Sequence, residues 1–246
     1  MTTSNLQLDQ TIGDIVRDHY QTAQVFKKNR LDFCCGGKKT LQQVCLEKNL
    51  EPKKLLTELE AAVETPEPID ALQYESWSAT QLIEHIVETH HAFIRHLAPD
   101  LLELSAKVAR VHSDKEPNHL TIHRIVQETM AELMEHLLKE EQILFPYIQN
   151  LERCVQTSQT PPRPHFGAVQ NPIRMMENEH GFVGRQLEAL RTLTHDYVLP
   201  EIACNTWRVV WEMLEALEND LHLHIHLENN ILFPKALQLE MASHSK

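Results

Sequence analysis

The sequence predicts an all-α protein in which a small helical domain precedes a four-helix bundle. Three observations predict this class. Only 6 of the 246 residues are glycine, and turn-rich β folds need many more chain breakers. Long stretches contain neither glycine nor proline. Within them, apolar residues recur every three or four positions, which is typical of amphipathic helices.

The first unit, residues 1–66, is expected to be the small helical domain. Ile12 and Val16 belong to an apolar stripe with helical spacing. The segment DFCCGG at residues 32–37 ends that helix, because its glycine pair marks a turn. Short helices are then expected from about Thr40 and from Pro52, since proline is favoured at the first helical position. Residues 65–76 read as a linker.

The second unit, residues 77–241, contains four long helical segments with one apolar stripe each, which is the pattern of a bundle. Ser78 and Gln81 form a capping box at the start of the first segment. The proline-containing stretch 151–171 is expected to be a loop between the second and third helices. The expected helix ranges are roughly 78–111, 119–150, 172–195 and 205–239.

Charge and composition restrict the class of partner and the compartment. The formal net charge of −12 argues against nucleic acid or an anionic membrane as a partner. No apolar run approaches the ~20 residues of a spanning helix, and residues 1–10 lack a secretory apolar core. The five cysteines suit no secreted disulfide framework. We therefore expect a soluble, cytoplasmic protein, and its acidic surface is compatible with a homodimer.

The unusual feature of the composition is 16 histidines. Each bundle helix carries one on its apolar stripe, and in two helices a glutamate follows that histidine by four residues, on the same helix face. A buried carboxylate is costly unless it is paired or bound to metal. Mixed nitrogen and oxygen ligation suits iron, manganese or zinc, and two acids with four imidazoles fit two ions better than one. The candidate ligands are His91, His136, Glu140, His180, His224 and Glu228.

An internal repeat gives this pattern its specificity. The segment HLLKEEQILFP from His136 to Pro146 matches HIHLENNILFP from His224 to Pro234 at histidine, glutamate and the ILFP ending. The two copies lie 88 residues apart, and His91 lies 89 residues before the histidine of the third helix. The bundle is therefore expected to consist of two similar helical hairpins. We expect one metal ion beside each hairpin, with the two glutamates bridging the ions.

Over nearly its whole length the chain resembles the iron–sulfur cluster repair di-iron proteins (the RIC family) of the hemerythrin-like superfamily. Three features carry the resemblance: DFCCGGK at residues 32–38, the paired HxxxE…ILFP motifs, and MENEH at residues 176–180. It implies an ScdA-N-like first domain and a hemerythrin-like bundle. It also implies two non-haem iron ions at the six candidate ligands, joined by an oxo or hydroxo bridge. The implied function is repair of clusters damaged by nitric oxide or oxidants, by iron donation to damaged or apo iron–sulfur proteins.

Two departures separate the chain from the oxygen-carrying hemerythrins that it also resembles. Those proteins place a second histidine where this chain has Gly184, and an aspartate at longer spacing where this chain has Glu228. Fewer imidazoles imply open coordination positions and argue against simple oxygen carriage. Alternatives are nitric oxide reduction at the same site, which would make the protein an enzyme, and a sensor or carrier of nitric oxide or oxygen. A purely structural bundle predicts no bound metal.

Several further residues have two interpretations each. His90 rivals His91, because its own stripe is also apolar, but the family register favours His91. Glu132 and Glu179 lie next to ligand positions. They are either outer partners of the ligands or part of an iron or proton path, or they belong to a solvated helix face.

Cys34 and Cys35 are either redox-active or iron-handling residues, or small buried hydrophobes of a turn. Nine further histidines are expected to be surface or capping residues: His85, His96, His119, His123, His165, His195, His222, His226 and His244.

Overall fold

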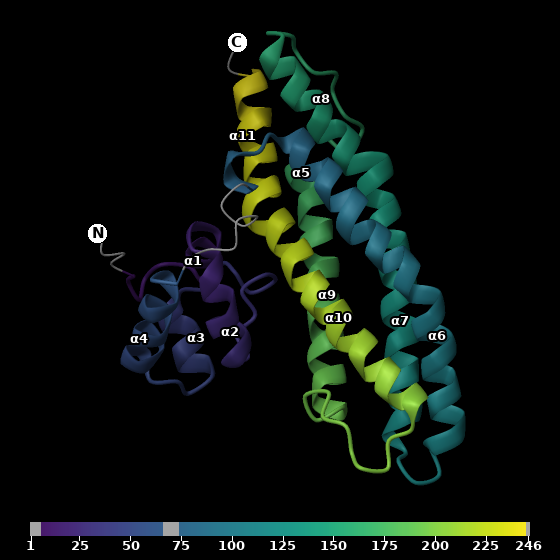
Figure 1. The fold of residues 1–246 in the computed structure, drawn as a ribbon. Coiled ribbons are helices and arrows are strands. Elements are labelled where there is room, and N and C mark those ends of the chain that lie inside the picture. Colours follow the sequence, from purple (N-terminus) through teal and green to yellow (C-terminus); the bar gives the residue numbers. More distant parts are fainter. Residues whose placement is uncertain (1–5, 66–73, 245–246) are drawn as a thin grey trace.

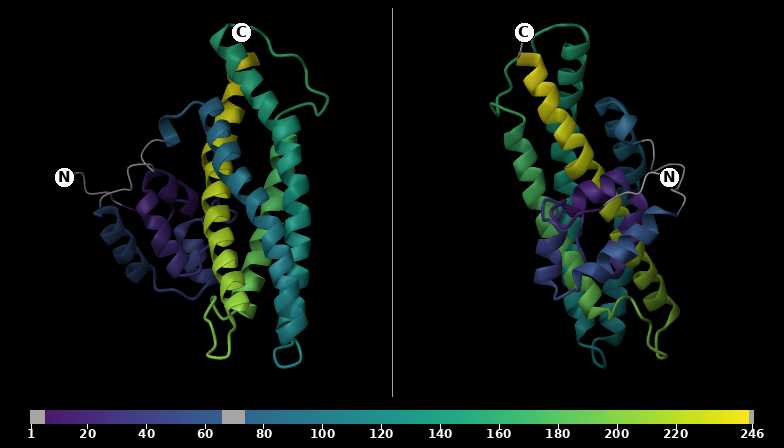
Figure 2. Two further views of the ribbon diagram at one scale, coloured as in Figure 1. Left: turned by 45° about the vertical axis from the view of Figure 1, so that its right-hand side comes forward. Right: turned by 90° about the vertical axis from the view of Figure 1, so that its left-hand side faces the viewer.

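The computed structural model describes residues 6–65 and 74–244, and these confirm the all-α class (Figure 1). Within the described ranges there is no β-strand, only an isolated antiparallel bridge between Thr11 and Thr40. Long helices form an elongated bundle, and a compact group of short helices lies against one side of it (Figure 2). No helix of the described part is long and apolar enough to cross a membrane.

The first hairpin of the bundle consists of two long helices, each interrupted by one π-helical turn. The predicted capping box at Ser78 and Gln81 is present. The second helix continues to Gln156, beyond the predicted end near residue 150, because Leu151 and Cys154 are buried in the bundle. The elements are α5 (Ala79–His85), η3 (Ile86–His91), α6 (Ala92–His112), α7 (Asn118–Lys139), η4 (Glu140–Leu144) and α8 (Phe145–Gln156). A short 3-10 turn, η2 (Tyr74–Ser76), precedes them.

The second hairpin repeats the plan with one difference, because its first helix, α9, is continuous. Its elements are α9 (Gln170–Leu193), α10 (Asn205–Leu227), η5 (Glu228–Leu232) and α11 (Phe233–His244). The π turns η4 and η5 occupy equivalent places in the sequence repeat. In each, the amide of a phenylalanine donates to the carbonyl of the glutamate five residues earlier. A proline follows each phenylalanine and has no amide of its own to donate, which accounts for the irregular turn.

The N-terminal unit consists of short helices around the DFCCGG turn. The single helix expected before that turn is divided, because His19 leaves the helical conformation with φ −145°. Capping of α3 by Thr40 and the proline at the start of α4 agree with prediction. The elements are α1 (Ile12–Asp18), η1 (Tyr20–Thr22), α2 (Ala23–Lys28), α3 (Leu41–Glu47) and α4 (Pro52–Val63).

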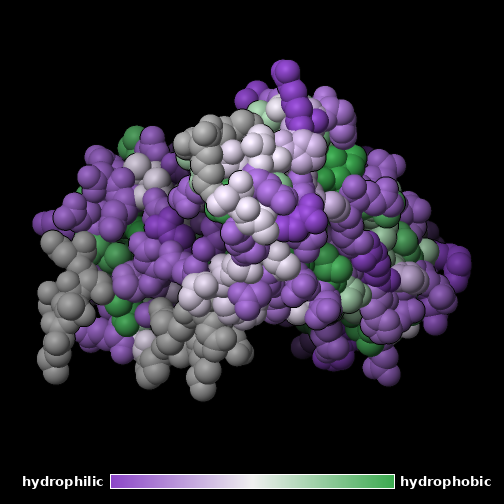
Figure 3. All heavy atoms as spheres, turned by 90° about the horizontal axis from the view of Figure 1, so that it is seen from above, coloured by the Kyte–Doolittle hydropathy of each residue, from purple (hydrophilic) through white to green (hydrophobic). Residues whose placement is uncertain are grey.

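The apolar core is divided into two clusters, with the polar site between them. On α10, Leu221 and Ile225 belong to one cluster, and Leu227 belongs to the other. The first cluster also contains Phe26 and Phe33, so the N-terminal unit packs directly on the bundle. The face seen in Figure 3 is mostly hydrophilic with separate hydrophobic spots, as the acidic composition predicts.

Candidate metal centre

The structure brings all six candidate ligands together in the bundle interior. Their exposed fractions are between 0% and 2%. Ligand atoms of four residues at a time lie within 4.8 Å of one another, in two groups that share both glutamates. The first group adds His91 and His224 to the glutamates, and the second adds His136 and His180.

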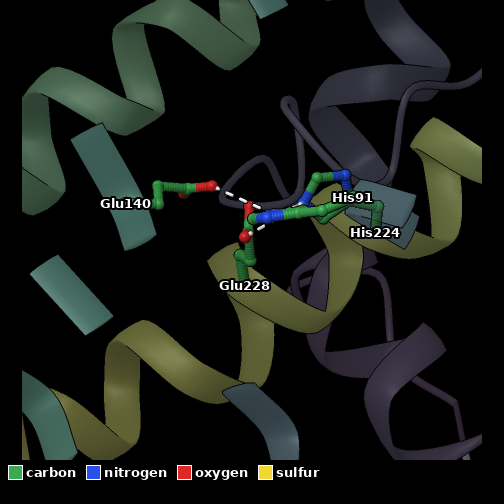
Figure 4. Close-up of side chains that lie close together, drawn as sticks. All are labelled: His91, Glu140, His224 and Glu228. Carbon is green, nitrogen blue, oxygen red and sulfur yellow. Dashed lines mark hydrogen bonds and ion pairs between the residues drawn. The ribbon is translucent and has the colours of Figure 1, made fainter. Parts of the chain in front are cut away.

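Each glutamate faces both groups, one oxygen toward each. Glu140 Oε2 lies 3.4 Å from His91 Nε2, and its Oε1 lies 3.3 Å from His136 Nε2. Glu228 Oε1 lies 3.0 Å from His224 Nε2, and its Oε2 lies 3.1 Å from His180 Nε2. Figure 4 shows His91 and Glu140 converging with His224 and Glu228, which follow each other on the continuous segment of α10 and η5.

Within each group the two imidazoles also face each other through Nε2, at 3.2 Å for His91 and His224 and 3.1 Å for His136 and His180. Both oxygens of Glu140 and Oε2 of Glu228 are buried without a hydrogen bond. Buried carboxylate oxygens that lack a hydrogen-bond donor are expected where a cation neutralises them. The buried cluster therefore indicates a metal-binding site.

The pairing of histidines corrects one expectation. We expected each ion to lie beside a single hairpin, but each group takes one histidine from each hairpin. The reason is the order of the helices around the bundle: α6 packs against α10, and α7 packs against α9. His91 precedes α6 and therefore faces His224 of α10, while His136 of α7 faces His180 of α9.

π turns coincide with three of the six candidate ligands. His91 ends η3, Glu140 begins η4 and Glu228 begins η5. A π turn inserts one residue into the α-helical register and is frequent at functional sites.

The pKa shifts of the clustered histidines and glutamates indicate that the buried acids require positive charge beside them. Burial acts to lower the pKa of His136, but Glu140 and its neighbours raise it to about 10. Burial acts likewise on His224, whose pKa is raised by Glu228. Burial would raise the pKa of Glu228, yet His224 and His180 hold it well below its ordinary value. Without metal, protons on His136 and His224 therefore supply positive charge beside the buried acids.

The outer nitrogens of three ligands have partners. His91 Nδ1 donates to Glu141 at 2.7 Å, and His136 Nδ1 donates to Glu179 at 2.8 Å. His180 Nδ1 donates to Asn229 Oδ1 at 3.0 Å. Acceptors at this nitrogen fix the ring orientation of a metal-ligating histidine.

Each of the two carboxylates that accept from the ligand histidines is itself bound by a cationic side chain. Arg95 donates to Glu141 at 2.8 Å, and Lys139 donates to Glu179. The position of Glu179 next to a ligand made it a candidate outer partner from the sequence. Glu141 and Asn229 were missed, although each follows a repeat glutamate at the same offset.

The other histidine predictions have mixed outcomes. His90 is buried, as its apolar stripe allows, but it bonds Asp220 at 2.8 Å and belongs to neither ligand group. The surface prediction is wrong for His119 and His226, which are 3% and 2% exposed. Trp207 packs on His119 at 4.2 Å between ring centroids.

His226 faces the N-terminal unit, where Phe33 packs on it. Burial lowers its pKa to about 3. Of the remaining predictions, the side chain of His244 lies outside the described residues. Glu132 is half-buried, and its outer role stays a prediction.

The two cysteines of the DFCCGG turn lie against the third bundle helix. Cys35 Sγ donates to the carbonyl oxygen of His180 at 3.2 Å. A Cβ atom on Gly184, one turn further along α9, would lie 3.3 Å from that sulfur. Glycine at this position therefore gives the cysteine turn room to approach the bundle.

Comparison with known families defines the class of protein. Residues 81–236 match the Hemerythrin HHE cation binding domain. Residues 8–63 match ScdA_N, a domain of unknown function. Fold and site together define a hemerythrin-like cation-binding protein with an added N-terminal domain.

Curated relatives make the family more specific. The Iron-sulfur cluster repair protein YtfE of Yersinia pseudotuberculosis serotype IB (strain PB1/+) is 37% identical over 232 residues, which are 94% of this chain and 98% of the relative. YtfE of Pectobacterium carotovorum subsp. carotovorum (strain PC1) is 37% identical over 235 residues, with the same shares covered. The chain belongs to this iron–sulfur cluster repair family.

Proposed function

We propose that this chain holds two iron ions at the buried centre and donates iron to iron–sulfur proteins whose clusters have been damaged by nitric oxide or oxidants. The observation that carries the proposal is the pair of four-residue groups that share Glu140 and Glu228. The names of the relatives support the repair role.

The residues would divide the work as follows. His91 and His224 would hold one ion, and His136 and His180 would hold the other. Glu140 and Glu228 would bridge, because each already offers one oxygen to each pair. An oxo or hydroxo bridge belongs to the same proposal. The bound iron supplies transferable metal, and the protein residues decide how firmly it is held.

Proton exchange provides a physical reason why such a site can release iron. Each group offers only two imidazoles and two shared carboxylates, which leaves open positions on a six-coordinate ion. When iron leaves, the imidazoles can take up protons, as the raised pKa values of His136 and His224 indicate. Those protons keep the buried acids neutralised, so the empty pocket does not have to unfold.

The partners and the organisation of the chain belong to the same proposal. Damaged or apo iron–sulfur proteins would be the acceptors, and the cytoplasm would be the compartment. The proposed domains are residues 1–66 and 77–241, and part of the segment between them lies outside the described residues.

Isotope transfer tests the function. The chain is loaded with ⁵⁷Fe and mixed anaerobically with a dehydratase whose cluster has been damaged by nitric oxide. We expect the dehydratase to regain activity and to carry the label in its cluster, faster than with free ⁵⁷Fe²⁺ at equal concentration. Glu228→Gln should abolish the transfer. The matched control is Glu135→Gln, because Glu135 is exposed on α7.

Other outcomes would replace the proposal. Recovery no faster than with free iron would contradict donation. Nitrous oxide produced over several turnovers would favour nitric oxide reduction at the same centre. Reversible oxygen binding with retained iron would favour a carrier.

A further inference from the structure

The cysteine turn has the dimensions of a metal–thiolate site. Cys34 Sγ and Cys35 Sγ lie 3.9 Å apart, which is far beyond the ~2.05 Å of a disulfide. Two thiolates at ~2.3 Å from one tetrahedral ion are ~3.8 Å apart. Asp32 Oδ1 lies 3.1 Å from Cys34 Sγ, and the three ligand atoms all lie within 4.8 Å of one another.

The local backbone holds these three groups in place. Asp32 Oδ1 accepts from the amides of Cys34 at 3.1 Å and Cys35 at 2.8 Å, which closes the turn. Asn230 Nδ2 donates to the carbonyl of Phe33 at 3.3 Å and ties the turn to η5. Such preorganisation favours metal binding, because little ordering of the chain remains to be done.

Charge in the turn favours a bound cation. Cys34 is 3% exposed, and Cys35 is half-buried. A divalent ion would offset the charges of two thiolates and a carboxylate that otherwise repel one another.

The turn lies between the buried centre and an open cavity. Asn229 Nδ2 donates to the carbonyl of Cys34 at 3.1 Å, while its Oδ1 accepts from the ligand His180. On the other side the two thiols line a cavity of about 460 Å³ between the N-terminal unit and the bundle. His222 lines the same cavity, and its buried Nδ1 has no hydrogen bond. Figure 2 shows the N-terminal unit against the bundle.

We propose that Asp32, Cys34 and Cys35 form a second metal site, which binds one divalent ion of the Fe²⁺ or Zn²⁺ type at the wall of this cavity. Binding releases the two thiol protons and involves no change of oxidation state. The three residues leave a fourth position open toward the cavity. If the proposed iron donation holds, on which this last step rests, the site receives iron on its way from the bundle to an acceptor.

Cobalt provides a spectroscopic probe of the site. The full chain, reduced and already loaded with iron so that the bundle centre is filled, is titrated anaerobically with Co²⁺. We expect thiolate-to-cobalt charge-transfer bands and intense tetrahedral visible bands that saturate at one Co²⁺ per chain. Cys35→Ser should reduce the charge-transfer intensity by at least half, because it leaves only the Cys34 thiolate in the turn. Asp32→Asn preserves an oxygen for the turn and should weaken Co²⁺ binding by about tenfold, because one ligand charge is lost.

Cys45→Ser is the matched control, since Cys45 is a buried free thiol of the same unit. It should leave the bands unchanged. Bands that are absent from the parent protein, or that keep their full intensity in Cys35→Ser, would overturn the second site. Because the readout is spectroscopic, the bands remain informative if labelled iron is never transferred, and failure of either proposal is distinguishable from failure of the other.

Discussion

The two histidine pairs of the centre share both glutamates but differ in what holds their outer nitrogens. In one pair Glu141 accepts from His91, and the buried Nδ1 of His224 has no hydrogen bond. In the pair of His136 and His180, the Nδ1 atoms of both histidines have a hydrogen-bond acceptor. The acceptor for His180 is Asn229, which also donates a hydrogen bond to the cysteine turn. The inner ligands are nearly symmetric, but among the described residues only the pair of His136 and His180 is linked by hydrogen bonds to the N-terminal unit, through Asn229 and Cys35.

The sequence repeat shows how this difference is built. Asn229 occupies the position equivalent to Glu141, 88 residues later, so an amide stands where the first hairpin has a carboxylate. His90 occupies the position equivalent to Glu179, 89 residues earlier. His90 bonds Asp220 and stacks on His224 at 5.5 Å between ring centroids. This contact replaces the hydrogen bond that Glu179 makes to His136.

Loss of a shared carboxylate should weaken metal binding at both histidine pairs equally. Breaking a buried charge cluster by removing one partner costs about 3–5 kcal/mol, which corresponds to a factor of about 10²–10⁴ in an equilibrium constant. We expect Glu140→Gln or Glu228→Gln to lose both ions, so iron analysis should give less than one ion per chain. Glu135→Gln should retain two. Two tightly held ions in either core variant would show that the glutamates are not shared.

A pH titration should separate the role of protons from that of metal. The pKa of His136 rises from 6.5 to about 10 in the folded metal-free protein. This contribution to stability is fully present below pH 6.5 and is lost as the pH rises toward 10, with a slope of up to ~1.4 kcal/mol per pH unit. Urea unfolding should show this decline in metal-free protein. A metal-ligated His136 binds no proton, so an equal decline in iron-loaded protein would contradict its assignment as a ligand.

The outer carboxylates should each affect one pair. Outer partners of metal-ligating histidines typically contribute 10–100-fold in affinity. We expect Glu141→Gln to weaken the ion at His91 and His224, and Glu179→Gln to weaken the ion at His136 and His180. Mössbauer spectra of ⁵⁷Fe-loaded variants should show a change in one of two iron environments. Equal changes at both irons in each variant would remove the distinction between the pairs.

Substitution of Asn229 should have the smallest effect on iron binding, and it should act on the His180 side of the centre. Losing its hydrogen bond to His180 costs about 1 kcal/mol, or about fivefold. We expect Asn229→Ala to speed iron release to a chelator by about that factor. Asn230→Ala is the matched control, because Asn230 also bonds the cysteine turn but contacts no ligand histidine. Equal rates in the two variants would mean that docking alone controls release.

The convergence of the six candidate ligands could be predicted from the sequence, because two chemical constraints coincide at these positions. A glutamate on an apolar stripe requires a counter-charge. The sequence repeat places such a glutamate in both hairpins, as Glu140 and as Glu228. The pairing of histidines could not be predicted, because helical spacing fixes a face and leaves the neighbour of each helix open. The contact of Cys35 with His180 could not be predicted either, because it depends on how two distant segments pack together. The glycine at position 184 is not sufficient to indicate this contact.

The most direct test is anomalous scattering at the iron edge from crystals of the iron-loaded protein. We expect two iron peaks between Glu140 and Glu228, one flanked by His91 and His224 and the other by His136 and His180. A single peak would contradict a centre with shared glutamates, as would two peaks that each lie beside the histidines of one hairpin.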